Sequence, residues 1–176
     1  MENDCEKYGL APIVCGNPKF LVLGTLPGDK SLKLKQYYSK SSNRFWKVVS
    51  ALCDCAVVPD DYDDRKKLLK KAHIALWDVY KKANRKGALD NNIKNAKINN
   101  LNEILKLLQD NPSIDTIVFN GKRPSKVFSE VLQDKLKNLL KNRTIEFIQM
   151  PSTSGANTRK TDKALIEDWK EKLRNI

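Results

Sequence analysis

Glycines and polar side chains directly follow four short apolar runs of the chain, and these four stretches hold the residues best suited to bind a ligand. They are residues 24–31, 77–78, 120–122 and 151–157. They supply glycines, hydroxyls and amides, but the single histidine, His73, lies outside them, so none of them holds a Ser–His or Cys–His nucleophile pair. This chemistry favours binding over covalent catalysis.

The first stretch, Gly-Thr-Leu-Pro-Gly-Asp-Lys-Ser, matches a phosphate-binding loop only weakly. It lacks the Gly-Lys-Ser/Thr ending of a Walker loop and the third glycine of a dinucleotide-binding turn. Two glycines on either side of Pro27 instead favour a fixed turn, whose backbone a flat ligand can approach closely.

Four aromatic side chains follow this turn: Tyr37, Tyr38, Phe45 and Trp46. Aromatic rings beside a polar turn can stack on a nucleic-acid base. Phe45 and Trp46 also fit the buried face of a helix, whereas Tyr38 lies outside that apolar pattern, so stacking is favoured for Tyr38. Asn43 has two interpretations as well, a functional one and a structural one, because asparagine just before an apolar helix is a common N-cap.

Short apolar runs alternate with helical patterns along the chain. We expect strands at residues 19–23, 73–79, 114–119 and 144–150, and helices at 43–51, 60–71, 100–108, 124–140 and 162–173. The alternation predicts a single α/β domain, residues 1–176, with three α/β/α layers around a central, mostly parallel four-stranded sheet. Ligands bind beyond the carboxyl ends of the strands in such a sheet, where the four polar stretches would meet. Residues 81–99 are expected to form a surface loop.

The chain is strongly basic, since 33 Lys and Arg against 21 Asp and Glu give a net charge of +12. Such an excess favours a polyanionic partner, nucleic acid before a membrane. A lysine-rich surface inherited from an AT-rich genome would give the same balance. The apolar runs are too short to span a bilayer, and the N-terminus does not resemble a secretory signal. We therefore expect a soluble, cytoplasmic protein.

The four cysteines do not indicate a metal site. Cys5, Cys15, Cys53 and Cys55 form no Cys-x-x-Cys pair and have no histidine at zinc-finger spacing. Cys53 and Cys55 could join a metal site, but buried thiols in a reducing compartment are favoured. We expect no bound metal.

The order of these motifs resembles the uracil-DNA glycosylase superfamily. Residues 24–31, Gln-Tyr-Tyr at 36–38 and Asn-Arg-Phe-Trp at 43–46 are similar to its first motif, and residues 151–157 are similar to its second. Ala-Leu-Trp-Asp-Val at 75–79 and Gly-Ala-Leu-Asp at 87–90 narrow the resemblance to the hypoxanthine-DNA glycosylase, or DNA-deoxyinosine glycosylase, branch. The similarity covers nearly the whole chain, from about residue 11 to about residue 172.

The resemblance implies a DNA repair enzyme that flips out a deaminated base and hydrolyses its N-glycosidic bond, leaving an abasic site. It implies that Asn43 is catalytic and positions the attacking water. The implied substrate-binding residues are Gly24, Thr25, Leu26, Pro27, Gly28, Tyr38, Phe45 and Asp78, although Asp78 also fits a structural carboxylate that accepts backbone N–H groups. The implied DNA-binding residues are Ser31, Ser152, Thr153, Ser154 and Asn157, of which Ser152, Thr153 and Ser154 also fit a turn. The expected partner is DNA that contains a deaminated base, hypoxanthine before uracil or xanthine. We expect no cofactor, no iron–sulfur cluster, no obligate protein partner and a monomer.

Three positions depart from the superfamily pattern. Leu26 stands where many members have Asp or Asn, Met150 where many have His or Asn, and Gly155 where this branch more often has Pro. The first two departures remove common catalytic groups and place more weight on Asn43. Two alternatives therefore remain open: a non-catalytic binder of damaged or single-stranded nucleic acid with the same fold, and an enzyme that acts on free nucleotides or nucleosides.

Overall fold

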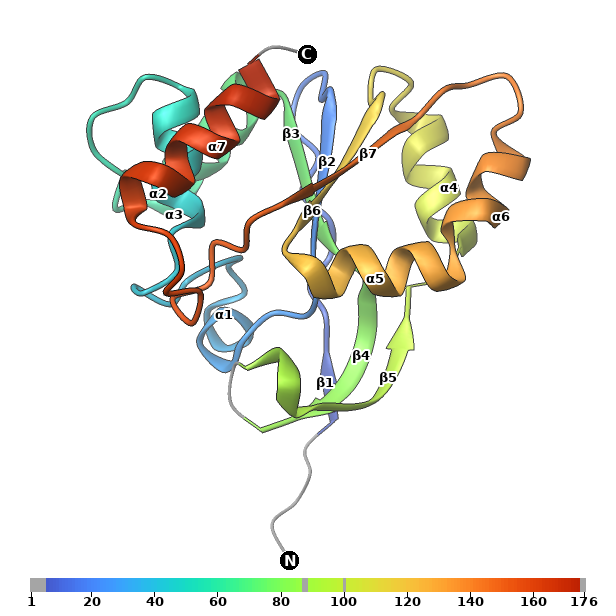
Figure 1. Ribbon diagram of the computed structural model, residues 1–176, viewed down its shortest axis with the longest axis horizontal. Helices are drawn as coiled ribbons and strands as arrows, with labels where there is room; N and C mark the ends of the chain where they lie inside the picture. The colour runs from blue at the N-terminus through green and yellow to red at the C-terminus, as the bar shows by residue number, and fades with distance from the viewer. Residues whose placement is uncertain (1–5, 87–88, 100, 175–176) are drawn as a thin grey trace, which may run out of the picture.

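A four-stranded parallel sheet forms the centre of the computed structural model, which describes residues 6–86, 89–99 and 101–174 (Figure 1). Its strands are β2 (Phe20–Gly24), β3 (Ile74–Asp78), β6 (Thr116–Asn120) and β7 (Glu146–Met150). Their order is β3-β2-β6-β7, and all neighbours are parallel. The four predicted strands and their parallel arrangement are confirmed.

Helices cover both faces of this sheet (Figure 1). On one face lie α2 (Phe45–Leu52), α3 (Tyr62–Lys71) and α7 (Asp162–Arg174); on the other lie α4 (Leu101–Asp110), α5 (Lys122–Val131) and α6 (Gln133–Leu139). The three α/β/α layers are therefore confirmed. The single helix expected at 124–140 is instead two helices, because φ at Leu132 is −116° and departs from the value of about −63° typical of an α-helix.

The alternation of side chains along the strands divides the core into two halves. In β2, Phe20 and Val22 pack toward α2, α3 and α7, whereas Leu21 and Leu23 pack toward α4, α5 and α6. Every residue of β2, β3 and β6 is buried. Continuous burial is typical of parallel strands that are covered on both faces, and it explains their uninterrupted apolar sequences.

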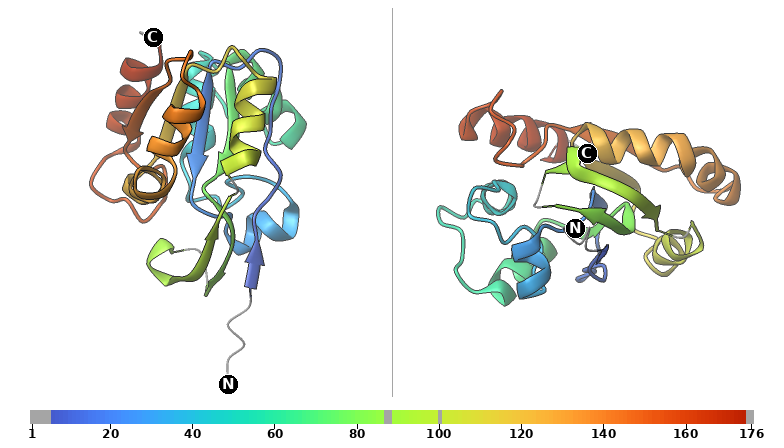
Figure 2. Two further views of the ribbon diagram at one scale, coloured as in Figure 1. Left: turned by 90° about the vertical axis from the view of Figure 1, so that its right-hand side faces the viewer. Right: turned by 90° about the horizontal axis from the view of Figure 1, so that it is seen from below.

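A smaller antiparallel sheet lies beside the carboxyl ends of the parallel strands (Figures 1 and 2). It consists of β1 (Glu6–Tyr8), β4 (Tyr80–Arg85) and β5 (Ile93–Ile98), and the 3-10 helix η1 (Asp90–Asn92) connects β4 to β5. The expected surface loop at 81–99 is therefore wrong. In β4, Tyr80, Ala83 and Arg85 are buried between more exposed polar residues. Because the strand has so few apolar residues, its sequence shows no recognisable strand pattern.

A short helix that was not expected, α1 (Asp29–Leu34), follows the first polar stretch. Gly87 of the motif at 87–90 and the expected helix start at residue 100 lie outside the described residues. Within the part of the chain that is described, no helix is long and apolar enough to cross a membrane.

Candidate functional site

The last residues of the four parallel strands form one row at the carboxyl edge of the sheet, here called the strand-end row. The register pairs Asp78 with Gly24 and Asn120 with Met150, and the pairing of β2 with β6 brings Gly24 next to Asn120. Because side chains alternate along a strand, the three side chains of this row point to the face covered by α2, α3 and α7. The expected meeting of the strand exits is confirmed.

A chain of hydrogen bonds crosses the strand-end row. Nδ2 of Asn120 donates to the Tyr38 hydroxyl (3.0 Å) and to Oγ1 of Thr153 (2.9 Å). Oδ1 of Asn120 accepts the backbone N–H of Thr153 (2.9 Å), and Oγ1 of Thr153 donates to Oδ1 of Asn43 (3.0 Å). The buried amide of Asn120 thus links Tyr38 and Asn43, which follow the first polar stretch, to the last stretch, residues 151–157.

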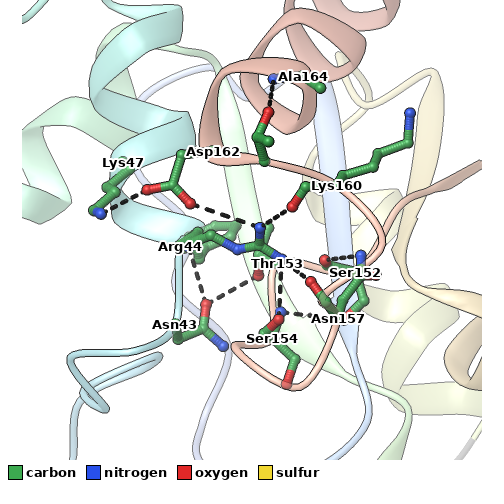
Figure 3. A network of polar contacts seen from close by, with 12 residues as sticks. Asn43, Arg44, Lys47, Ser152, Thr153, Ser154, Asn157, Lys160, Asp162 and Ala164 are labelled. Carbon is green, nitrogen blue, oxygen red and sulfur yellow. Dashed lines mark hydrogen bonds and ion pairs between the residues drawn. The ribbon is translucent and has the colours of Figure 1, made fainter.

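The side-chain oxygen of Asn43 is hydrogen-bonded within the protein, whereas its side-chain nitrogen has no partner among the described residues. Its Oδ1 accepts both the Thr153 hydroxyl and the backbone N–H of Phe45 (2.9 Å), which uses its two lone pairs and supports the start of α2. The Phe45 N–H can only donate, so it fixes which amide atom faces the helix. Among the described residues, Nδ2 of Asn43 has no partner, and Figure 3 shows it pointing away from Thr153. Asn43 can therefore offer a donor to a ligand or a water molecule.

The neighbouring Arg44 is buried and fixes the shape of the last polar stretch (Figure 3). Its guanidinium donates to the carbonyl oxygens of Ser154 (3.2 Å), Asn157 (2.7 Å) and Lys160 (2.8 Å). Its backbone N–H also donates to the carbonyl oxygen of Thr153 (2.9 Å). Two consecutive residues, Asn43 and Arg44, therefore hold the same distant segment.

The segment of residues 151–157, called the second loop below, is also bonded internally. Oγ of Ser152 accepts the N–H of Ser154 (3.2 Å), and the Ser152 carbonyl accepts from Nδ2 of Asn157 (2.9 Å). All three residues are half-buried, while Gly155 at the tip is exposed. A side chain at Gly155 would come within 2.7 Å of the Ser42 carbonyl oxygen, so glycine permits this close approach.

The turn of residues 24–28, called the first loop below, is fixed from the small sheet. Arg85 of β4 is only 2% exposed and donates to the carbonyl oxygen of Pro27. Asp90 accepts the hydroxyl of Thr25 (2.7 Å) and lies 3.6 Å from the Arg85 guanidinium. Leu26 points into the hydrophobic core. The small sheet thus holds the backbone of the loop that borders the strand-end row.

Asp78 is buried at the end of β3, and no described residue donates a hydrogen bond to its carboxyl group. Its exposed fraction is 4%, and Oδ2 is fully enclosed without a partner. Burial raises the pKa of Asp78 to about 7, while Arg85 lowers it and Asp90 raises it. Buried carboxyl groups normally have hydrogen-bond partners, and a displaced pKa is common at functional sites.

Tyr38 lies against the strand-end row. A side chain on Gly24 would collide with Oδ1 of Asp78 and lie 2.8 Å from the Tyr38 hydroxyl oxygen, so both groups border the same space. The Tyr38 ring stacks on Phe45, with 4.2 Å between ring centroids, so a base could stack only on its other face. Burial, and then the Asp78 carboxyl, raise the pKa of the Tyr38 hydroxyl, which therefore stays protonated.

Some predicted contact residues are not exposed in this arrangement. Phe45 and Thr153 are 0% exposed and Ser31 is 5% exposed. Oγ of Ser31 accepts the N–H of Ser39 (3.1 Å), and the Thr153 hydroxyl is used in the network above. Both hydroxyls therefore stabilise the protein's own turns, and their contact with DNA stays a prediction. Gly28, which is half-buried, precedes α1 as its N-cap.

Three residues of the site were given no individual function from the sequence: Arg44, Arg85 and Asn120. Arg44 belongs to the motif at 43–46, and Asn120 opens the polar stretch after a predicted strand, so both positions carried a signal. Arg85 carried none, because it lies in a Lys-rich segment interpreted as a loop. Across the residues that the structure describes, no group of three or more His, Cys, Asp or Glu could hold a metal ion.

Comparison with known proteins gives a consistent result. The family model of the uracil DNA glycosylase superfamily matches residues 11–174. A hypoxanthine DNA glycosylase of Methanosarcina barkeri is 32% identical over 94% of this chain and 97% of its own length. A hypoxanthine DNA glycosylase of Methanosarcina acetivorans is 30% identical over 96% of this chain and 99% of its own length. The solution NMR structure of a candidate uracil DNA glycosylase from Methanosarcina acetivorans has a TM-score of 0.77 and 29% identity, covering 97% of this chain and 98% of that one.

Proposed function

This chain belongs to the uracil DNA glycosylase superfamily, and we propose that it is a monofunctional hypoxanthine DNA glycosylase. It extrudes a deaminated base from the duplex, hydrolyses the N-glycosidic bond and leaves an abasic site. The two relatives named hypoxanthine DNA glycosylase support hypoxanthine as the first substrate, because each matches nearly the whole chain. Uracil and xanthine are the next candidates. We further propose that the chain acts as a single-domain monomer with damaged DNA as its partner.

The observation that carries this proposal is the free amide nitrogen of Asn43 beside the strand-end row. Thr153 and the start of α2 occupy both lone pairs of Oδ1, so the side chain cannot rotate freely. Its one available function is donation from Nδ2. Asn43 thus orients the attacking water by donating to its oxygen and does not remove a proton from it.

Bond cleavage places positive charge on the sugar and negative charge on the departing base. The electron pair of the C1′–N9 bond leaves with the base, and the water oxygen forms the new bond to C1′. The proton that this water loses passes to solvent, and the released base takes up a proton from solvent. Fixed peptide dipoles of the first loop stabilise the developing negative charge, because Arg85 and Asp90 hold that loop in place before the reaction. No side-chain amine is required as a nucleophile, so the product is an abasic site without strand cleavage.

The second candidate function is a non-catalytic binder of damaged nucleic acid. It is favoured by Leu26 and Met150, which are 5% and 2% exposed and occupy positions where a polar catalytic group was expected from the resemblance. Since both side chains are apolar and belong to the core, neither can replace that group. This candidate predicts damage-selective binding without release of a base.

A single-turnover assay separates the two candidates. End-labelled duplexes that carry hypoxanthine, uracil, xanthine or no lesion are incubated with the protein, and alkali then cleaves abasic sites. We expect cleavage at hypoxanthine that falls by at least about 100-fold in Asn43→Ala, a loss typical of removing one well-placed donor. Asn142→Ala, an exposed asparagine beyond α6, is the matched control and should retain the wild-type rate.

The alternative results have distinct meanings. Cleavage at uracil alone would keep the enzyme but reassign its substrate. Binding of the hypoxanthine duplex without cleavage by the wild-type protein would favour the non-catalytic binder.

A further inference from the structure

A large apolar side chain is exposed directly beside the first loop. Leu89 is 54% exposed and immediately precedes η1. We propose that Leu89 is the wedge that enters the duplex and fills the space left by the extruded base. This inference rests on the proposed function and assigns to that reaction a residue that lies outside both loops.

Hydrogen bonds fix the backbone at Leu89 against the first loop. Asp90, the next residue, accepts the hydroxyl of Thr25 (2.7 Å) and lies 3.6 Å from the buried Arg85 guanidinium. The carbonyl oxygen of Leu89 accepts the backbone N–H of Asn92 (3.1 Å). The segment that carries Leu89 is therefore held on both sides of this residue's peptide unit, while the side chain itself is exposed.

The same segment lies near the strand-end row. The Asp90 carboxylate raises the pKa of both Asp78 and Tyr38, which belong to that row or lie against it. Figures 1 and 2 show η1, the short yellow-green helix, beyond the carboxyl ends of the parallel strands and on the same side of the molecule as the second loop. Leu89 is therefore placed to reach DNA that is bound across this edge of the sheet.

The tip of the second loop offers no large apolar side chain that could act as a wedge. Its exposed residues are Gly155 and Ala156, and the adjacent Ser154 and Asn157 are polar and half-buried. A side chain at Gly155 would come within 2.7 Å of the Ser42 carbonyl oxygen, so this position has no room for a larger residue. The wedge must therefore come from another element that borders the site.

Extrusion of a base leaves a gap between the neighbouring base pairs, and an apolar side chain in that gap replaces part of the lost stacking. Proteins that unstack DNA commonly insert such side chains, leucine among them. Scattered exposed leucines are common and indicate nothing by themselves. Leu139, 53% exposed at the end of α6, is one of these. Leu89 differs because its backbone is fixed beside the site.

The test compares hypoxanthine in a duplex with hypoxanthine in a single strand, both in single turnover. A wedge acts on the stacked duplex, because a single-stranded base costs least to unstack. Leu89→Ala should slow base release from the duplex about 10- to 100-fold, the range for burial of a leucine side chain, and should change the single-strand rate less than about 2-fold. Leu89→Met keeps the apolar bulk and should retain most of the duplex rate. Leu139→Ala is the matched control and should behave as the wild-type protein.

A fluorescence measurement tests extrusion without base release. A 2-aminopurine next to the lesion becomes brighter when its neighbour leaves the stack. At saturating protein, the wild-type protein and Leu139→Ala should raise the signal of the hypoxanthine duplex, whereas Leu89→Ala should lose most of this rise.

Each result decides the matter. If the wild-type protein cleaves hypoxanthine but Leu89→Ala keeps the duplex rate, or slows duplex and single strand equally, the inference is overturned and the proposed function stands. Leu89→Met that is as slow as Leu89→Ala on the duplex overturns the inference as well. If the wild-type protein releases no base, the proposed activity fails and the fluorescence decides: a rise that Leu89→Ala loses supports the inference, and equal signals or no rise overturn it. The same reading applies if the wild-type protein cleaves the duplex alone.

Discussion

At the scale of single residues, Thr153 is the point where the two loops of the site meet. Its hydroxyl accepts from Asn120 and donates to Asn43, and it is completely buried. Thr153→Val keeps the shape but leaves both amides short of a partner, so we expect a loss of about 1–3 kcal/mol in the free energy of unfolding. We also expect at least a several-fold slower base release, because Asn43 is held less firmly. Thr144→Val, at an exposed position, should change neither the unfolding curve nor the rate.

Asp78 makes a second prediction at this scale, on stability. Its pKa is raised to about 7 in the folded protein by burial, among Arg85, Asp90, Tyr37 and Tyr38, against an ordinary value near 4 when unfolded. Between these values the folded state binds more protons, so this group lowers the free energy of unfolding as the pH rises from about 4 to 7. The cost has an upper limit of about 4 kcal/mol.

Asp78→Asn removes that ionisation and its cost. The variant should therefore gain stability relative to the wild-type protein as the pH rises from 5 to 8, measured by urea unfolding at each pH. An Asp78→Asn difference that stays constant across this range would mean that the carboxyl ionises without cost in the folded state.

At the scale of elements, the sequence predicted the parallel sheet because its strands carry their own signal. Residues 74–77 and 117–119 are apolar on both faces, which is the pattern of a strand between two helix layers. The small sheet gave no such signal. In β4 the buried residues are Tyr80, Ala83 and Arg85, and in β5 only Ile93 is buried. These two strands depend on contacts with distant parts of the chain, and a local sequence pattern cannot reveal such contacts.

The candidate site was predictable to the same extent. Strand exits and the resemblance indicated Asn43, Asp78 and the two loops, and the structure brings these together. The burial of Ser31 and Thr153 was not predictable, because a serine or threonine in a turn can face solvent or cap a backbone group equally well. Arg85 was missed because its function depends on pairing between the small sheet and the first loop.

Arg44 connects elements, and its removal tests how far the second loop depends on α2. Arg44→Met keeps the length of the side chain but removes its hydrogen bonds to three carbonyl oxygens and its ion pair with Asp162. We expect faster hydrogen exchange across residues 152–160 and slower base release, with rescue in part by Arg44→Lys. Lys47→Met is the matched control, because Lys47 pairs with the same Asp162 but is exposed and contacts no carbonyl of the loop.

Protection of residues 152–160 that is equal in Arg44→Met and the wild-type protein would mean that the loop keeps its shape without the Arg44 guanidinium.

At the scale of the whole molecule, the net charge of +12 is only partly available to a partner. On α3 and α4, lysines pair with acids one turn away, as Lys66 does with Asp63 and Lys106 with Asp110. Around the site, several basic side chains have no such acidic partner in the part of the chain that is described. Exposed cations with no ion pair among the described residues come from four separate segments, at Lys30, Lys40, Lys122 and Arg159. We therefore propose that the carboxyl edge of the sheet, which these four segments border, approaches the phosphate backbone.

This distribution predicts a specific dependence of DNA binding on salt. Each neutralised phosphate contributes about −0.9 to the slope of log K against log salt concentration, so a footprint of about 4 phosphates weakens binding roughly 100-fold between about 50 and 200 mM salt. Hypoxanthine and undamaged duplexes should give equal slopes, since phosphate contacts do not depend on the base. Lys122→Gln should lower the slope by about 0.9, whereas Lys106→Gln, which removes the same charge from α4, should leave it unchanged. Equal slopes for both variants would mean that the positive charge acts through the net charge of the molecule and that the carboxyl edge makes no localised contact with the backbone.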